Sequence, residues 1–272
     1  MKTLILEPDL LDCWSEKNRF ALIMQMQGTV YREIEKRITL KFTHNQQNYF
    51  IKKHHGIPAT EWLKSILFGC ASSFGARNEV NLLNRLHQLG IKAPLVAGFG
   101  EQGRNPLNKQ SFIITREVFD VLGLDTYESK WKNQELTWKM KQYLLYQIAS
   151  ITRTLHQNGI NHRDLYACHF MVLQTDAVHP DVTLMDLHRA AIWKKIPIRW
   201  IIKDLASLYY SIWNFNITKR DIYRFIQYYS GRAWRVEITE SLVFWSAVKK
   251  RTRHFIKRHS KFFTTPLNNV GE

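Results

Sequence analysis

The sequence contains few cysteines and no long apolar run. Only three cysteines occur among 272 residues, Cys13, Cys70 and Cys168. An odd number at wide spacing argues against a disulfide framework and indicates a reducing compartment. No run of about 18 apolar residues occurs, so no segment is expected to span a membrane. The first residues, MKTLILEPDLL, hold too short an apolar segment for a signal peptide, and we expect a cytoplasmic protein.

Acidic residues are also scarce. There are 23 Asp and Glu against 39 Lys and Arg, which gives a formal net charge of +16. Such an excess concentrates polyanions near the surface. Nucleic acid, an anionic membrane surface and a phosphorylated substrate all fit, and charge alone does not choose among them. The hydrophobic content of 45% is sufficient for a folded core.

The expected elements change type along the chain. Alternating apolar residues predict strands within 20–53 and a β-rich run at 111–118. Helical spacing predicts a short helix at 61–69, a firmer one at 78–89 and a long one at 136–156, ended by Gly159. A short strand at 182–184 precedes mostly helical sequence from 200 onward. The order predicts an α+β protein of two lobes, with boundaries at 1–118 and 119–272.

The stretch INHRDLYACHF, residues 160–170, carries the most specific motif. Its HRD tripeptide opens the catalytic loop of protein kinases, in which the aspartate orients the acceptor hydroxyl. Asp164 is therefore the candidate catalytic residue, while His162 and Arg163 are expected to brace the loop. Five residues after the aspartate, kinases have a metal-binding asparagine; here that position is His169.

The other parts of a kinase site occur in the required chain order. Lys52 ends the strand NYFIK, where it could grip the phosphates of ATP. Its neighbour Lys53 would face the opposite side of the strand. Glu79 lies on the following helix and could hold Lys52. Asp186, in TLMDLHRA, follows a short strand at the place of the magnesium-binding aspartate.

Three weaker expectations complete this candidate site. The glycine-rich GxGxxG loop is absent, and only Gly28 is near the place of a nucleotide-covering loop between strands. Residues 115–118, which include Thr115 and Glu117, are the expected hinge that contacts adenine. Asp204, in KDLASLYY, is expected to hydrogen-bond the backbone of the catalytic loop.

Taken together, the segments GINHRDLYACHF, LMDLHRA, KDLASLYYS, TVYREIEKR, YFIKKHHG and GARNEVNLLNRLHQLGI resemble the bacterial lipopolysaccharide core heptose kinases, a branch of the protein-kinase-like superfamily. The matches run from about residue 28 to 225. His169 is shared with that family, so its presence does not indicate a dead enzyme. It could coordinate metal or donate a hydrogen bond to phosphate.

The resemblance implies a bilobal kinase fold with an ATP cleft between a small strand-rich lobe and a larger helical lobe. It implies transfer of the γ-phosphate of ATP, with Mg²⁺, to the innermost heptose of a lipid A–core acceptor at the inner face of the inner membrane. Asp164 would be catalytic, Asp186 and His169 would bind metal, and Lys52, Glu79, Gly28, Thr115 and Glu117 would bind ATP.

Two questions stay open at this level. A kinase for Kdo and a protein kinase share these motifs and are not excluded by them. A non-catalytic basic module that kept the fold is a further alternative, against which the retention of Lys52, Asp164 and Asp186 argues. The basic segment 241–263 predicts a helix that either lies on anionic lipid or is a final lobe helix with a solvated basic face. No nucleic acid is expected as a partner.

Overall fold

The computed structural model describes residues 2–34, 36–56, 75–105, 107–174 and 179–263. The helix predicted at 61–69 lies outside the described residues. The chain forms two compact units, Met1–Val121 with Thr183–Ala191, and Leu122–Val182 with Ile192–Glu272. The segment that carries Asp186 therefore belongs to the first unit, although it follows the catalytic-loop motif in the sequence. The α+β class predicted from the sequence is confirmed.

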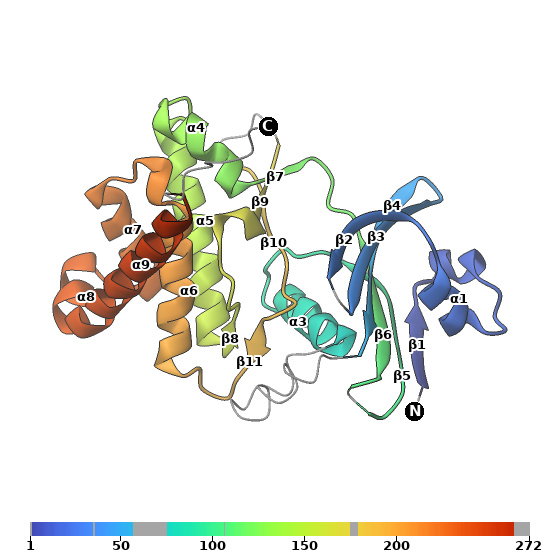
Figure 1. The fold of residues 1–272 in the computed structure, drawn as a ribbon. Helices are drawn as coiled ribbons and strands as arrows, with labels where there is room; N and C mark the ends of the chain where they lie inside the picture. Colours follow the sequence, from blue (N-terminus) through green and yellow to red (C-terminus); the bar gives the residue numbers. More distant parts are fainter. Residues whose placement is uncertain (1, 35, 57–74, 106, 175–178, 264–272) are drawn as a thin grey trace, which may run out of the picture. The chain divides into compact units, whose positions relative to one another are not determined.

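The first unit is built on an antiparallel sheet of six strands (Figure 1). In spatial order the strands are β1 (Lys2–Leu6), β5 (Val96–Gln102), β6 (Gln110–Arg116), β4 (Gln47–His55), β3 (Arg37–His44) and β2 (Thr29–Ile34). The turn between β3 and β4 places Asn45 and Gln46 at positive φ, which short polar side chains tolerate best. The connection between β3 and β4 is thus a tight two-residue turn.

Two helices cover opposite faces of this sheet, α1 (Arg19–Gln25) on one and α3 (Ala76–Gln88) on the other (Figure 1). The 3-10 helix η1 (Pro8–Cys13) precedes α1. Strands throughout 20–53 were expected, and this is wrong for the first residues. Phe20, Ile23 and Met24 recur at helical spacing and are buried against the sheet, so the apolar run forms a helix.

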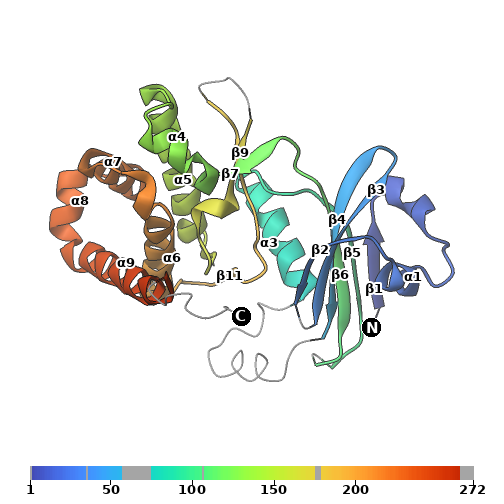
Figure 2. The same cartoon turned by 45° about the horizontal axis from the view of Figure 1, so that its top comes forward.

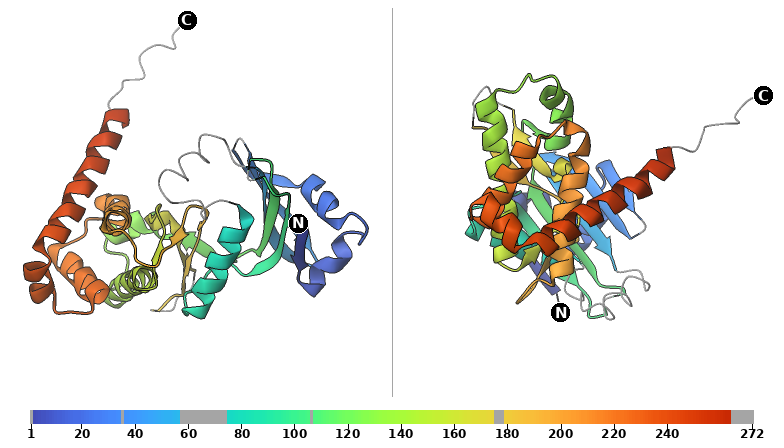
Figure 3. Two further views of the ribbon diagram at one scale, coloured as in Figure 1. Left: turned by 90° about the horizontal axis from the view of Figure 1, so that it is seen from below. Right: turned by 90° about the vertical axis from the view of Figure 1, so that its left-hand side faces the viewer.

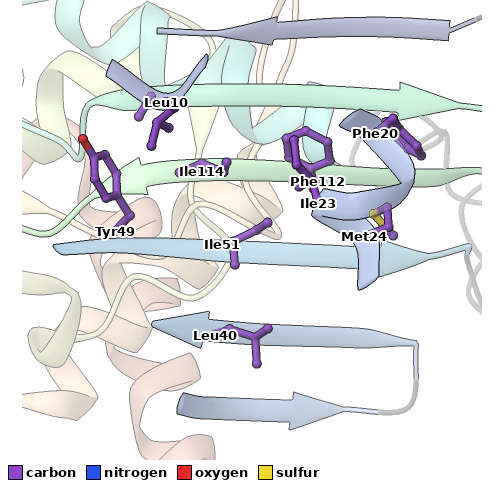
Figure 4. Close-up of a cluster of buried hydrophobic side chains, with 10 residues drawn as sticks. Leu10, Phe20, Ile23, Met24, Leu40, Tyr49, Ile51, Phe112 and Ile114 are labelled. Carbon is purple, nitrogen blue, oxygen red and sulfur yellow. The ribbon is translucent and has the colours of Figure 1, made fainter. Parts of the chain in front are cut away.

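The core on the α1 side of the sheet is aliphatic and aromatic (Figure 4). Phe20 of α1 lies beside Phe112 of β6, with ring centroids 5.6 Å apart. Ile51 of β4 faces the same core and is fully buried. Because side chains alternate along a strand, the neighbours of Ile51 must point to the other face, where α3 lies. This alternation decides which β4 residues meet α3.

The second unit is mostly helical (Figure 2). Its helices are α4 (Glu128–Lys132), α5 (Trp138–Gln157), α6 (Ile198–Ser211), α7 (Lys219–Ser230), α8 (Trp234–Glu240) and α9 (Leu242–Phe263), with 3-10 helices η3 (Leu124–Tyr127), η4 (Ala167–His169) and η5 (Trp213–Phe215). The α5 and α7 helices pack together, as do α6 and α9. The predicted long helix at 136–156 corresponds closely to α5.

Short strands lie where the chain passes between helices and between units. They are β7 (Val121–Gly123), β8 (Ile160–Asn161), β9 (Phe170–Leu173), β10 (Val182–Leu184) and β11 (Ala191–Ile192). The loop with the HRD motif lies between β8 and η4. Among the described residues, no helix is long and apolar enough to cross a membrane. Neither Cys13 nor Cys168, the two cysteines in the described part of the chain, forms a disulfide.

Candidate active site

In the first unit, the central feature is an ion pair between β4 and α3. Lys52 Nζ lies 2.5 Å from Glu79 Oε1. Glu79 is buried, with 5% of its surface exposed, so the pair is shielded from solvent. The sequence expectation that Glu79 holds Lys52 matches this geometry. An ammonium group fixed in this way is a suitable ligand for phosphate oxygens.

The adjacent lysine, Lys53, has a different environment. Its side chain points to the α1 face and Nζ donates to the carbonyl oxygens of Met24 and Met26. These carbonyls lie at the end of α1, where a cation is favoured by the helix dipole. Burial lowers the pKa of Lys53 to about 8. Lys53 therefore supports α1, and Lys52 is the lysine on the α3 face.

Asp186 completes the cluster of the first unit. Its Oδ1 lies 4.0 Å from Lys52 Nζ and accepts a hydrogen bond from His188 Nδ1. The residue has φ of 57°, in the left-handed region that asparagine and aspartate tolerate better than most residues. Its segment is held to the unit by two bonds, from Asn78 Nδ2 to the carbonyl of Ala190 and from Leu184 N to the carbonyl of Lys92. A partly exposed carboxylate is thereby fixed near the Lys52 ammonium.

The expected hinge residues lie at the end of β6. Thr115 is buried in the strand, and Glu117 follows the strand directly. The Glu117 carboxylate accepts hydrogen bonds from Lys41 Nζ at 2.6 Å and Asn48 Nδ2 at 2.7 Å. Burial alone would raise the pKa of Glu117, but these two bonds outweigh it and hold the pKa below its usual value. The Glu117 carboxylate is occupied by these two hydrogen bonds. Any contact of Glu117 with adenine would therefore be made by its backbone groups.

Gly28 does not lie in a turn between two strands. It comes directly before β2, whereas the β2–β3 connection is formed by residues 35 and 36, of which Glu35 lies outside the described residues. A Cβ atom on Gly28 would lie 2.9 Å from the carbonyl oxygen of Lys41. The close approach of β3 therefore explains why a glycine is needed here. The expectation was a nucleotide-covering loop between strands near Gly28; Gly28 lies before β2, and its role toward ATP stays a prediction.

In the second unit, the HRD segment is fixed by Asp204 of α6. Asp204 is fully buried, and its two carboxylate oxygens accept the backbone N–H groups of His162 at 2.7 Å and Arg163 at 2.8 Å. His156 Nε2 lies 3.4 Å from the same carboxylate. Arg163 has φ of 70°, and its guanidinium group lies 4.9 Å from the ring centroid of Trp200. Asp204 therefore hydrogen-bonds the backbone of the loop, as the sequence predicts, and the bracing roles of His162 and Arg163 stay predictions.

Asp164 and His169 are linked through the backbone of the loop. His169 Nδ1 lies 2.7 Å from the carbonyl oxygen of Asp164, which also accepts the N–H of Tyr166. The His169 ring stacks on that of His162, with centroids 5.4 Å apart. Donation from Nδ1 fixes the tautomer in which the lone pair is on Nε2, the nitrogen that a metal ion would require. This tautomer favours a metal ligand or a hydrogen-bond acceptor over a donor to phosphate.

One residue in contact with the catalytic loop was missed by the sequence reasoning. Lys203, directly before Asp204, lies with Nζ 3.5 Å from Asp164 Oδ1 and donates to the carbonyl of Arg163. Its position in KDLASLYY, one residue before the predicted bracing aspartate, could have indicated this contact with the loop. His188, two residues after Asp186, contacts the Asp186 carboxylate through Nδ1.

Comparison with known proteins also indicates a kinase. The family described as "Lipopolysaccharide kinase (Kdo/WaaP) family" matches residues 22–229. The lipopolysaccharide core heptose(I) kinase WaaP of Escherichia coli strain K12 is 36% identical over 249 residues, covering 90% of this chain and 94% of the relative. The protein of the same name from Pseudomonas aeruginosa is 31% identical over 262 residues, covering 95% and 98%.

A solved structure is also similar. The structure titled "WaaP in complex with acyl carrier protein" matches with a TM-score of 0.79 and 29% sequence identity, over 93% of this chain and 98% of that chain. The kinase-like fold expected from the sequence is therefore confirmed. With the match of the family to most of the chain, the conclusion is direct: this chain belongs to the lipopolysaccharide kinase (Kdo/WaaP) family.

Proposed function

We propose that this protein transfers the γ-phosphate of ATP to a hydroxyl of the innermost heptose of the lipopolysaccharide core. The observation that carries the proposal is the likeness to heptose(I) kinases over nearly their whole length, together with a Lys52–Glu79 ion pair beside Asp186. Phosphoryl transfer needs positioning and neutralisation of charge more than covalent chemistry, and these side chains are suited to both.

Lys52 would bind the phosphates of ATP. Its ammonium is oriented by Glu79, so little side-chain freedom is lost when a phosphate binds. The backbone of Thr115 and Glu117 would contact adenine at the end of β6. The close packing of Gly28 against β3 is sufficient to explain why this residue is a glycine. Its position before β2 would also let the adjacent backbone approach the nucleotide.

Asp186 of the first unit would bind Mg²⁺, and its donor atoms fit this ion; His169, in the second unit, is the other metal ligand that the sequence predicts. Mg²⁺ prefers carboxylate oxygen, takes few protein ligands and completes its coordination with water and substrate phosphate. Among the described residues no three His, Cys, Asp or Glu side chains converge as a ready-made metal site. The Asp186 carboxylate is one quarter exposed and held by His188, so it fits; a histidine ligand is less usual for Mg²⁺. When bound, the ion would neutralise charge on the transferred phosphoryl group.

Asp164 would orient the heptose hydroxyl and accept its proton. The carboxylate lies on a loop whose backbone is fixed by Asp204, so its direction is set before the acceptor binds. In phosphoryl transfer the acceptor proton is lost late, and a correct direction matters more than a raised pKa.

We further propose that the basic face of α9 contacts the anionic inner face of the membrane in which the acceptor lies. Val248 and Phe255 are buried against Leu205 and Ala206 of α6, so these two apolar side chains of α9 pack within the unit and are not available for insertion into lipid. Six Lys and Arg side chains of α9 are exposed: Lys249, Lys250, Arg251, Arg253, Lys257 and Arg258.

Two features make α9 suitable for this contact. The helix has no acidic residue between Leu242 and Phe263. Its C-terminal half extends beyond the other helices of the second unit (Figure 3). Each basic residue near an anionic leaflet contributes about 1 kcal/mol. The triple change Lys250→Glu, Arg253→Glu and Lys257→Glu should therefore abolish sedimentation with phosphatidylglycerol vesicles. The matched change Lys139→Glu, Lys219→Glu and Arg220→Glu, on exposed residues of α5 and α7, should not.

The principal test is transfer of label from γ-labelled ATP to dephosphorylated lipid A–core, with and without Mg²⁺. Wild type is compared with Asp164→Ala, and Kdo₂-lipid A without heptose is the control acceptor. Label on the heptose-containing acceptor alone, lost with Asp164→Ala, is the expected result. Label on the heptose-free acceptor would favour a Kdo kinase. Binding of ATP without transfer to either would favour a protein acceptor or a non-catalytic module.

A further inference from the structure

Two consecutive residues of α6 point at the HRD loop, and they act on opposite sides of one residue. Asp204 Oδ1 accepts the N–H of Arg163 at 2.8 Å, and Lys203 Nζ donates to the carbonyl oxygen of Arg163. Both polar backbone groups of Arg163 are thus bound by α6. The bracing of the loop is therefore shared between an acidic and a basic side chain.

The backbone of Arg163 needs such support. Its φ of 70° lies in the left-handed region, which is unfavourable for a residue with a β-carbon. A residue of this kind persists where its surroundings over-determine it. The conformation of Arg163 in turn sets the direction in which the next residue, Asp164, leaves the loop. Lys203 therefore influences Asp164 through the chain.

Lys203 also acts on Asp164 directly. Its Nζ lies 3.5 Å from Asp164 Oδ1, and both side chains are less than one fifth exposed. Lys203 Nζ is 5.8 Å from the centroid of the Trp200 ring, which is also contacted by the Arg163 guanidinium group. A cation held on one carboxylate oxygen restricts rotation of that carboxylate. Partial burial makes this effect less screened by solvent.

We propose that Lys203 is a positioning residue for phosphoryl transfer, which acts by fixing both the Arg163 carbonyl and the Asp164 carboxylate. The inference rests on the proposed role of Asp164 and extends it to a residue outside the HRD motif. A misplacement of a reacting group by about 1 Å can cost about 100-fold in rate. Loss of Lys203 should therefore lower kcat, while the affinity for ATP, which depends on Lys52, should change little.

The experiment compares Lys203→Met with the matched control Lys195→Met, which removes one exposed lysine from the same unit. Phosphate transfer is measured as kcat and as KM for ATP, and the thermal midpoint is measured alongside. We expect kcat of Lys203→Met to fall by about 10- to 100-fold with KM for ATP within about twofold of wild type. Lys203→Arg, which keeps the charge and the N–H donors, should recover most of the loss. Activity of Lys203→Met within twofold of wild type would overturn the inference.

Two further variants separate positioning from folding. Lys203→Gln keeps an N–H donor for the Arg163 carbonyl but has no charge, so it tests the Asp164 contact in a protein whose loop is still braced. In an Asp164→Asn background, Lys203→Gln should have almost no further effect on the residual kcat, because the group through which it acts is gone. An equal loss in both backgrounds would show that Lys203 does not act through Asp164. If wild type itself transfers no phosphate to the heptose acceptor, the proposed function fails first and the inference with it.

Discussion

Lys52 Nζ and Glu79 Oε1 lie 2.5 Å apart, joining the central strand β4 to α3. The pair is a consequence of strand alternation. Ile51 and Lys53 face the core on the α1 side, so Lys52 must face α3, whose first turn presents Glu79. The buried Glu79 carboxylate requires a partner of opposite charge, because an unpaired buried carboxylate is energetically costly. The fold therefore sets the position of this ammonium group.

We predict that Lys52→Met lowers kcat/KM for ATP by about 100- to 1000-fold, since the variant loses a fixed cation at the phosphates. Lys17→Met, which removes an exposed lysine from the same unit, is the control and should behave as wild type. Transfer is measured with labelled ATP on proteins shown to be folded by circular dichroism. If Lys52→Met kept kcat/KM within threefold of Lys17→Met, the phosphate-binding role of Lys52 would be wrong.

A second prediction concerns Asp204, which is fully buried and accepts two backbone N–H groups. In Asp204→Asn the amide can present an oxygen to one N–H group, but its NH₂ then faces the other. A buried donor left without an acceptor costs about 1–3 kcal/mol, and more where the lost bonds were charge-assisted. We expect the free energy of unfolding to fall by about 3 kcal/mol, measured by urea denaturation.

The control for this change is Asp120→Asn. Asp120 is exposed and has φ of 51°, a conformation that asparagine tolerates well. Its substitution should alter the free energy of unfolding by less than about 0.5 kcal/mol. Equal effects of the two changes would mean that Asp204 does not brace the loop as its hydrogen bonds indicate.

Some of this geometry could be predicted from the sequence because it depends on local periodicity. Alternation along β4 separates Lys52 from Lys53, and the order of strand, helix and HRD loop assigns Glu79 and Asp164 to their elements. The α5 helix and the β10 strand follow from the same kind of pattern. These features are decided by neighbours along the chain, and a single sequence contains them.

The remaining features depend on contacts between distant segments. The apolar run that contains Phe20 and Ile23 suits either a strand or a helix, and burial against the sheet decides for α1. The left-handed backbone of Asp186 and Arg163 leaves no signature in residue type that separates it from ordinary loops. The contact of Lys203 with Asp164 joins residues 39 positions apart. None of these is set by local spacing.

The third prediction uses the pH dependence of stability. His54 lies on β4, and no described residue offers a hydrogen-bond partner to its buried Nε2 atom. Burial, only partly offset by Glu79, lowers the pKa of His54 to about 4 from an ordinary value of 6.5. Between these two values the unfolded chain binds more protons than the folded one, so stability falls as the pH is lowered from 6.5 to 4. The contribution is at most about 3 kcal/mol.

His54→Gln should remove this contribution. The difference in unfolding free energy between wild type and His54→Gln should therefore shift in favour of the variant as the pH falls from 6.5 to 4, measured by urea denaturation at each pH. His55→Gln is the matched control, because the neighbouring imidazole is exposed. Its pH profile should follow that of wild type. Parallel profiles for all three proteins would show that His54 titrates in the folded state as it does in the unfolded chain.

The last prediction concerns the turn that leads from α5 into the HRD loop. Gly159 has φ of 75°, and a Cβ atom there would lie 2.2 Å from the carbonyl oxygen of Trp193, whose N–H donates to the Gly159 carbonyl. Gly90 has a similar φ of 72°, but its Cβ would meet no atom within 4 Å. Gly90→Ala should cost only the backbone strain, about 1 kcal/mol. Gly159→Ala adds a steric conflict with backbone atoms that must shift, so we expect a total loss of at least about 2–3 kcal/mol. The difference between the two variants in unfolding free energy, measured by urea denaturation, isolates the steric conflict with Trp193. Equal losses would mean that the Trp193 backbone moves aside at no cost in free energy.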